Sequence, residues 1–263
     1  MGGMVFKEKI SKLFLCRRTL WDMSVAQWRS RYASSYLGIW WTIIPPLILA
    51  LSINFVFKLV FKIDMPGYTI FALAGILPWF FLVNSLEQAT NSFIASAPIL
   101  RQGIFPREFI PLAYVLANLI NFVISLALFL PLIIFLNFKI VFLLFLLPLV
   151  IILHFIFVFG LALFLASVNV FIRDVAHFLT TVFMIWFWVT PVFYPLGMVS
   201  SPFRWVCLLN PMTHYIILYQ KLLFYGTRPT PKELLIVFLI SVFSFSLGYL
   251  YFNKKQSILS KNI

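Results

Sequence analysis

Long apolar runs, bounded by charged or turn-forming residues, recur along this chain. A helix needs about 20 apolar residues to cross the roughly 30 Å hydrocarbon core of a bilayer. Five runs reach that length, at residues 37–61, 70–93, 109–136, 141–168 and 234–252. A sixth, shorter run covers residues 177–193 and ends near Pro191 and Pro195. The pattern predicts six transmembrane helices.

The runs are apolar on every face, whereas the strands of a membrane β-barrel are short and alternate apolar with polar residues. The predicted fold class is therefore an all-α integral membrane protein. We divide it into a cytoplasmic interface segment (1–36), a transmembrane domain (37–253) and a cytoplasmic tail (254–263).

Residues 195–231 are the ambiguous stretch. Part of it is apolar enough for a seventh span, but polar and helix-breaking residues interrupt it, namely Asn210, Pro211, His214 and Lys221. Helices broken at membrane depth are tolerated only against protein or a water-filled cavity. The sequence therefore predicts two short re-entrant helices hinged at Asn210 and Pro211.

Six spans put both termini on one side of the membrane. If that side is the cytoplasm, 13 of the 20 Lys and Arg residues lie inside and 7 lie outside. The positive-inside rule favours this topology, with both the N-terminus and the C-terminus in the cytoplasm.

The first 36 residues place aromatic and aliphatic side chains at helical spacing with basic residues between them. This pattern predicts an amphipathic helix along the cytoplasmic interface, broken near Arg17 and Arg18. Two interpretations stay open: a membrane anchor, or a lever that takes force from a cytosolic partner.

Composition narrows the possible functions. The 263 residues are 63% hydrophobic and 10% charged, which leaves no room for a large soluble domain. The net charge of +13 falls in loops beside anionic lipid head groups, so we expect membrane lipids and no nucleic acid as partners. Cys16 and Cys207 are predicted on opposite sides of the membrane, which disfavours a disulfide between them.

Signals of enzyme chemistry are nearly absent. The 7 acidic residues and 3 histidines are scattered, and no metal-ligand or nucleophile motif occurs, so we expect no catalytic residue and no metal site. Without a GxxxxGK[ST] loop, the chain hydrolyses no nucleotide itself. A separate subunit must supply energy if the chain performs transport.

Few ionisable groups lie within the predicted spans, which argues against an ion-coupled carrier. We interpret Glu87 as part of a structural ion pair with Arg101 or Arg107, with a proton relay as the alternative. His154 is interpreted as a hydrogen-bonded packing residue.

Aromatic residues make up 19% of the chain. Lipid-facing Phe and the interfacial belts of Trp and Tyr account for most of them. Two groups, at the first and fifth spans, suggest a surface along which sugar rings slide. They are Tyr36, Trp40, Trp41, Trp186, Trp188 and Tyr194.

Four segments in order resemble ABC-2-type transporter permeases. Residues 32–47 (YASSYLGIWWTIIPPL) resemble the start of the family's first span, and 105–112 (FPREFIPL) its loop between spans two and three. Residues 169–194 (NVFIRDVAHFLTTVFMIWFWVTPVFY) resemble its fifth span, and 210–226 (NPMTHYIILYQKLLFYG) the segment after it. The resemblance is nearest to permeases that export O-antigen, capsule or teichoic acid.

This resemblance implies a homodimer of six-span subunits in the bacterial cytoplasmic (inner) membrane. Two copies of a cytosolic ATPase subunit would bind ATP and Mg, while this chain itself would hold no cofactor. The implied substrate is a lipid-linked polysaccharide, moved outwards.

The resemblance also assigns roles to residues. The interface helix and residues 97–108 would dock on the ATPase through Trp28, Arg29, Arg101, Phe105, Arg107 and Glu108. Arg173 and Asp174 would form a local salt bridge at the start of the fifth span. Asn210, Pro211 and His214 would belong to an outer gate formed by the re-entrant helices.

Two other functions stay open. A permease of this family could carry a drug or a lipid instead of a glycan. A membrane-embedded lipid-modifying glycosyltransferase would need acids near one interface, for which Glu87, Glu108 and Asp174 are the candidates.

Overall fold

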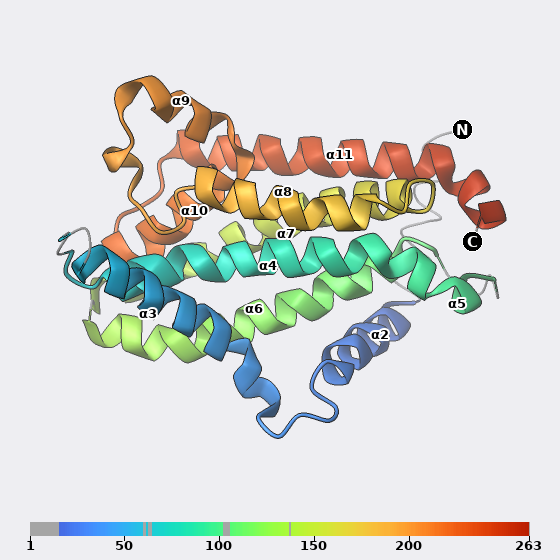
Figure 1. Ribbon diagram of the computed structural model, residues 1–263, viewed down its shortest axis with the longest axis horizontal. Coiled ribbons are helices and arrows are strands. Elements are labelled where there is room, and N and C mark those ends of the chain that lie inside the picture. Colours follow the sequence, from blue (N-terminus) through green and yellow to red (C-terminus); the bar gives the residue numbers. More distant parts are fainter. Residues whose placement is uncertain (1–15, 60–61, 63–64, 102–105, 137, 263) are drawn as a thin grey trace.

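The computed structural model describes residues 16–59, 62, 65–101, 106–136 and 138–262, which form helices and their connections (Figure 1). No strand occurs among these residues, which confirms the all-α prediction.

Four long helices run side by side along the length of the molecule (Figure 1). They are α4 (Tyr68–Ala95), α6 (Phe109–Leu136), α7 (Leu147–Asn169) and α11 (Pro231–Asn262). A 3-10 helix, η2 (Phe138–Leu146), leads into α7. Among the described residues, four stretches are long and apolar enough to cross a membrane: Tyr68–Ala95, Phe109–Leu136, Ile140–Asn169 and Pro231–Gln256.

The first and fifth predicted spans are shorter helices. The first begins with a 3-10 helix, η1 (Gly38–Thr42), and continues as α3 (Ile44–Leu59), which has 16 residues. The fifth is α8 (Val175–Val189), which has 15 residues. Both are apolar but below the length of about 20 that crosses a bilayer, so the count of six spans and the topology remain predictions.

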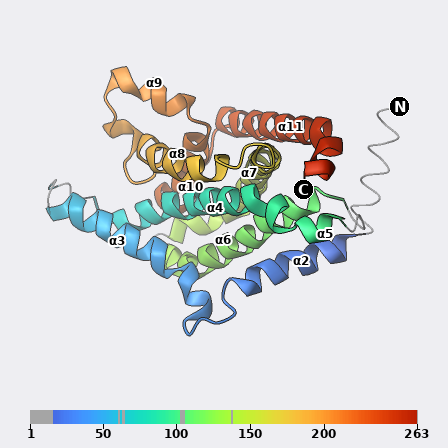
Figure 2. The ribbon, with the colours of Figure 1, turned by 45° about the vertical axis from the view of Figure 1, so that its right-hand side comes forward.

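The N-terminal helix of the described chain, α2 (Arg17–Ser30), begins at the predicted break and packs against α6. The first half of the predicted interface helix lies outside the described residues. A short helix, α5 (Ala97–Arg101), follows α4. In both ribbon views α2 and α3 lie along one side of the bundle, and α9 and α11 lie along the opposite side (Figure 2).

The stretch after α8 forms short helices, as predicted. It contains η3 (Leu196–Met198), α9 (Ser201–Leu209), α10 (Pro211–Gln220) and one π-helical turn, η4 (Lys221–Tyr225). The break falls at Asn210, whose side chain accepts the backbone N–H of Met212 at 3.0 Å and so caps α10. Pro211 occupies the first turn of α10, where its missing N–H costs nothing. Whether these helices re-enter the membrane stays a prediction.

Helix α4 is the centre of the bundle, because it packs against α3, α6, α7, α8 and α10. Helix α7 packs extensively along α11, where Gly160 faces Gly248. A Cβ at residue 248 would lie 2.0 Å from the carbonyl oxygen of Gly160, so the two backbones are in contact. Small residues permit this approach between apolar helices.

Candidate functional site

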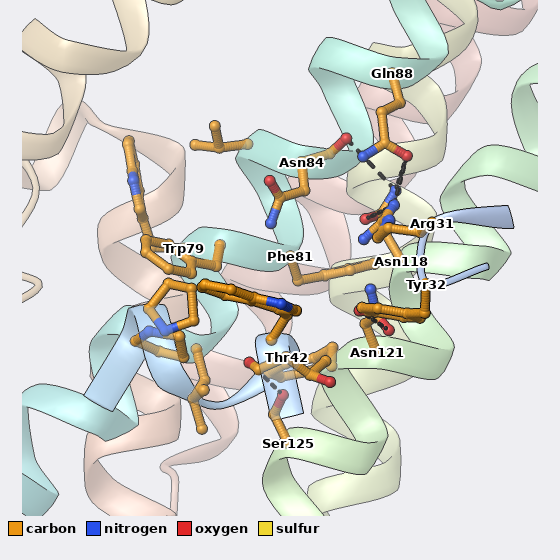
Figure 3. A pocket seen from close by; sticks show the side chains of 17 residues that line it. Arg31, Tyr32, Thr42, Trp79, Phe81, Asn84, Gln88, Asn118, Asn121 and Ser125 are labelled. Atoms are coloured by element: carbon orange, nitrogen blue, oxygen red, sulfur yellow. Dashed lines mark hydrogen bonds between the residues drawn. The ribbon is translucent and has the colours of Figure 1, made fainter. Parts of the chain in front are cut away.

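A pocket of about 460 Å³ lies between the end of α2, η1, the start of α3, α4 and α6 (Figure 3). Polar side chains line one part of it: Arg31, Asn84, Gln88, Asn118, Asn121 and Ser125. Aromatic and other apolar side chains line the rest, including Trp41, Pro45, Pro46, Leu77, Trp79 and Phe80. In Figure 3, Arg31 and Trp79 lie on opposite sides of the pocket.

Arg31 is the charged group of this pocket. Its Nη2 donates to Oε1 of Gln88 at 2.6 Å and to Oδ1 of Asn118 at 2.9 Å. Asn118 also donates from Nδ2 to the same Gln88 oxygen, at 3.2 Å. Three elements thus meet at one guanidinium: the end of α2, α4 and α6.

Burial lowers the pKa of Arg31 from its ordinary value, while the neighbouring Tyr32 opposes the shift. A guanidinium nevertheless stays protonated in proteins. Within the described part of the chain, no carboxylate forms an ion pair with Arg31. The charge of this partly exposed side chain is therefore met by neutral groups, the two amides and the hydroxyl of Tyr32.

Asn121 fixes the end of α2 against α6. Its Oδ1 accepts the indole N–H of Trp28 at 2.7 Å and the hydroxyl of Tyr32 at 3.0 Å. Ser125 Oγ, one turn further along α6, donates to the carbonyl oxygen of Thr42 at 3.3 Å. The pocket wall is thus held by side-chain hydrogen bonds between elements far apart in sequence.

The residues predicted to dock on an ATPase fall into different environments. The indole N–H of Trp28 donates to Asn121 within the chain, whereas Arg29 on the same helix is exposed. Arg107 donates to the carbonyl oxygen of Gln256 at 2.7 Å, which ties the loop before α6 to the end of α11. Glu108 is buried. Phe105 and the side chain of Arg101 lie outside the described residues, and the docking role stays a prediction.

The two predicted aromatic groups approach each other through Trp79, which the sequence analysis did not single out. Trp79 and Trp41 both line the pocket, while the ring of Trp79 meets that of Trp186 edge to face at 5.8 Å. A Trp inside an apolar run resembles an ordinary membrane residue, so nothing in the sequence marks it.

The other predicted aromatic residues have different surroundings. Tyr36, Trp40 and Trp188 are exposed. Tyr194 donates from its hydroxyl to the carbonyl oxygen of Trp188 at 3.0 Å. A role of these six rings in contacting sugars remains a prediction.

Asn210 connects α8 to the hinge between α9 and α10. Its Oδ1 accepts the indole N–H of Trp186 at 2.7 Å, and its Nδ2 donates to Oγ1 of Thr190 at 2.7 Å. His214, on the next turn, lies with Nε2 at 2.9 Å from the carbonyl oxygen of Leu208. The hinge predicted from the sequence is therefore joined to the fifth predicted span by side chains.

A second hollow, of about 730 Å³, lies beside the hinge between α10 and the start of α11. His214, Lys221 and Glu233 line it, and Lys221 Nζ forms a 2.6 Å ion pair with Glu233 Oε1. Unlike Arg31, Lys221 has a carboxylate partner here, while Lys232 adds a further positive charge to the lining.

The ionisable residues that we predicted to be structural have two kinds of environment. His154 is fully buried, stacks on Tyr215 at 4.9 Å between ring centroids and lies 3.4 Å from the hydroxyl of Tyr219, which confirms a packing residue. No ion pair joins Glu87, Arg173 or Asp174 to another described residue, and the predicted partner Arg107 is bound to Gln256 instead.

Comparison with known proteins identifies the family. Residues 19–224 match the model of the ABC-2 type transporter. An O-antigen export system permease protein RfbA of Klebsiella pneumoniae is 31% identical over 202 residues, which are 75% of this chain and 76% of that protein. A protein of the same name from Myxococcus xanthus is 27% identical over 235 residues, 89% of this chain and 90% of its own. The chain therefore belongs to the ABC-2 type transporter family, as a multi-pass protein of the bacterial inner membrane.

Proposed function

We propose that the chain is the membrane subunit of an ATP-driven exporter that moves a lipid-linked polysaccharide, such as O-antigen, across the inner membrane. The observation that carries this proposal is the similarity, over about three quarters of both chains, to permeases named for O-antigen export. The family implies an ABC ATPase partner, and the chain lacks a nucleotide-binding loop of its own.

The pocket around Arg31 supports a transport role. Asn118, Asn121 and Ser125 lie in the middle third of α6, and Asn84 lies in the middle third of α4. Charged side chains within membranes usually face the bundle interior or water and mark the path of a substrate, and Asn118 holds Arg31 at this level of the bundle. In this proposal, ATP binding in the partner pushes α2 and residues 97–108, and α3 and α8 then move.

A homodimer is part of the proposal. Helices α3 and α8 expose large apolar side chains and pack on fewer neighbours than α4 does. The exposed residues are Ile48, Leu51, Phe55, Phe178, Met184 and Ile185. A second copy that covers part of these faces would place α3 and α8 at the dimer axis, around a channel for the glycan.

Deletion of the gene in its native host tests the export function. We expect the glycan to accumulate on the cytoplasmic side and to disappear from the cell surface, as scored by surface labelling of intact and lysed cells. Re-expression of the full chain should restore surface glycan only when the partner ATPase can hydrolyse ATP. Unchanged surface glycan in the deletion strain would refute the proposal.

Cysteine crosslinking tests the dimer, in a chain whose Cys16 and Cys207 are replaced by Ser. Ile185→Cys on α8 should give a crosslinked dimer in membranes with a bifunctional thiol reagent. Leu239→Cys, on the exposed face of α11, is the matched control and should remain monomeric. Equal crosslinking at both positions would show random collision, and no crosslinking at Ile185→Cys or at Phe55→Cys on α3 would contradict the proposed axis.

A further inference from the structure

We propose that the pocket around Arg31 is a binding site for the phosphate group of a membrane lipid, with the guanidinium as the anchoring group. The site would take the head of the lipid at its polar end and the first part of the tail along its apolar walls. Four observations on this pocket carry the proposal.

The first observation is the uncompensated charge. Arg31 lies against Asn118, in the first half of a helix long and apolar enough to span a membrane. A charge beside hydrocarbon is costly and normally has a charged partner or water. The groups that meet the guanidinium are the neutral amides of Gln88 and Asn118 and the hydroxyl of Tyr32, and no described carboxylate pairs with it. An anion in the pocket would remove this cost.

The second observation is the unused hydrogen-bonding capacity. Both hydrogen bonds of Arg31 to these amides start from one nitrogen, Nη2, although a guanidinium carries five N–H donors. The side-chain amide of Asn84 lines the pocket and makes no hydrogen bond to another described residue. An arginine fork together with a free amide suits the oxygens of a phosphate.

The third observation is the rigidity of the anchor. Trp28 and Tyr32, on either side of Arg31 in sequence, are both fixed to Asn121 of α6. Gln88 and Asn118 are themselves joined, so the acceptors that orient Nη2 are held in place. A preorganised donor loses less entropy when it binds a ligand than a free surface arginine does.

The fourth observation is the two-part lining. Beyond the amides, the pocket continues between Pro45 and Pro46 of α3 and the rings of Trp79 and Phe80 of α4. A soluble anion has no apolar part that could contact these walls, whereas a lipid joins an anionic head to an apolar tail. Phosphate is the common anionic group of membrane lipid heads, which selects it over other acidic groups.

Two lipids share this chemistry: an ordinary phospholipid of the bilayer, and a polyprenyl phosphate of the kind that could carry a glycan. The site itself is inferred from the pocket alone, and only its assignment to the carrier rests on the proposed function. Lipid binding and export are measured separately, so either idea can fail without the other.

Native mass spectrometry of the full chain, purified in detergent, tests the site. The probes are a polyprenyl phosphate and phosphatidylglycerol, each paired with its phosphate-free counterpart, the polyprenol and diacylglycerol. Arg31→Gln should weaken retention of both phosphate lipids by about tenfold or more, the effect of losing a hydrogen-bonded charge. Arg29→Gln, which removes an exposed charge from the same helix, is the matched control and should stay within about twofold of the unaltered chain.

The outcomes separate cleanly. Preference for polyprenyl phosphate over phosphatidylglycerol supports the site and assigns it to the carrier, while equal retention supports the site and assigns it to bilayer lipid. Equal loss in Arg31→Gln and Arg29→Gln, or polyprenol retained as well as its phosphate, overturns the proposal.

A second variant guards against misfolding of Arg31→Gln. Asn84→Ala removes an amide that has no protein partner among the described residues, so the fold should not change. It should weaken retention of the phosphate lipids by about fivefold while the melting temperature stays constant. Unchanged retention in both Asn84→Ala and Arg31→Lys, which keeps the charge but loses the fork, would also overturn the proposal.

Discussion

Two regions of this bundle are held together in different ways. Along the α7–α11 seam the backbones touch at Gly160 and Gly248, and Ser241 and Ser244 of α11 donate to the carbonyl oxygens of Leu153 and Phe157, both at 2.8 Å. Helices α3 and α8 instead expose apolar faces on one side, pack on α4 on the other, and are tethered by single side-chain hydrogen bonds. The α7–α11 seam is thus fixed by touching backbones, whereas α3 and α8 are held by side-chain packing and tethers.

This difference bears on how a permease would work. Two helices whose backbones touch cannot slide to a slightly different position without a large cost in energy. The reason is that a close-packed interior transmits strain and does not deform. A helix held by side-chain packing and single hydrogen bonds can exchange these contacts at a modest cost. We therefore expect α7 and α11 to act as a rigid scaffold and α3 and α8 to be the elements that move.

The largest expected effect comes from breaking the seam. Gly248→Ala would place a Cβ 2.0 Å from the Gly160 carbonyl oxygen, so the helices must separate. We expect a destabilisation of about 3 kcal/mol, at the upper end for overpacked cores, seen as a lower melting temperature and reduced yield in membranes. Gly197→Ala is the matched control, since a Cβ there meets nothing within 4 Å. Equal melting temperatures for the two variants would show that the seam is not rigid.

The second effect comes from cutting the tether of α8. Asn210→Ala removes the acceptor for Trp186, the donor to Thr190 and the cap of α10, at a buried position. We expect a loss of about 2 kcal/mol and a larger loss of export, because the hinge is no longer joined to α8. Melting temperature and surface glycan are measured together.

Asn210→Ser separates the two roles of this residue. Serine restores the cap of α10 but is too short to bridge to Trp186, so it should recover part of the stability and little of the export. If Asn210→Ala leaves both quantities at the level of the unaltered chain, packing alone holds α8.

The sequence predicts the scaffold better than the tethers, for a physical reason. The apolar runs that became α4, α6 and α11 report burial in lipid, which depends on composition over about 20 residues. The runs that contain α3 and α7 do not reveal that they begin as 3-10 helices, η1 and η2. That choice depends on tertiary contacts, which no local pattern encodes.

The candidate site was predicted only in fragments. Arg31 contacts Gln88 and Asn118, which lie 57 and 87 residues away, and each looks unremarkable in its own segment. Asn210 was found in advance because an Asn-Pro pair inside an apolar stretch is a local signal for a break. Trp79 was missed because its importance comes from its neighbours on η1 and α8.

The smallest effect is expected at the tether of α3. Asn54 Nδ2 donates to Oγ1 of Thr69 on α4 at 3.1 Å, in a partly buried position. Hydrogen bonds between membrane helices contribute about 0.6 kcal/mol on average, so Asn54→Ala should lower the melting temperature only slightly. A double-mutant cycle with Thr69→Val, read by thermal unfolding in detergent, isolates this pair. A coupling of that size would agree with a helix α3 that is weakly held and can move. A coupling near 3 kcal/mol would instead place α3 in the rigid scaffold and remove the contrast with the α7–α11 seam.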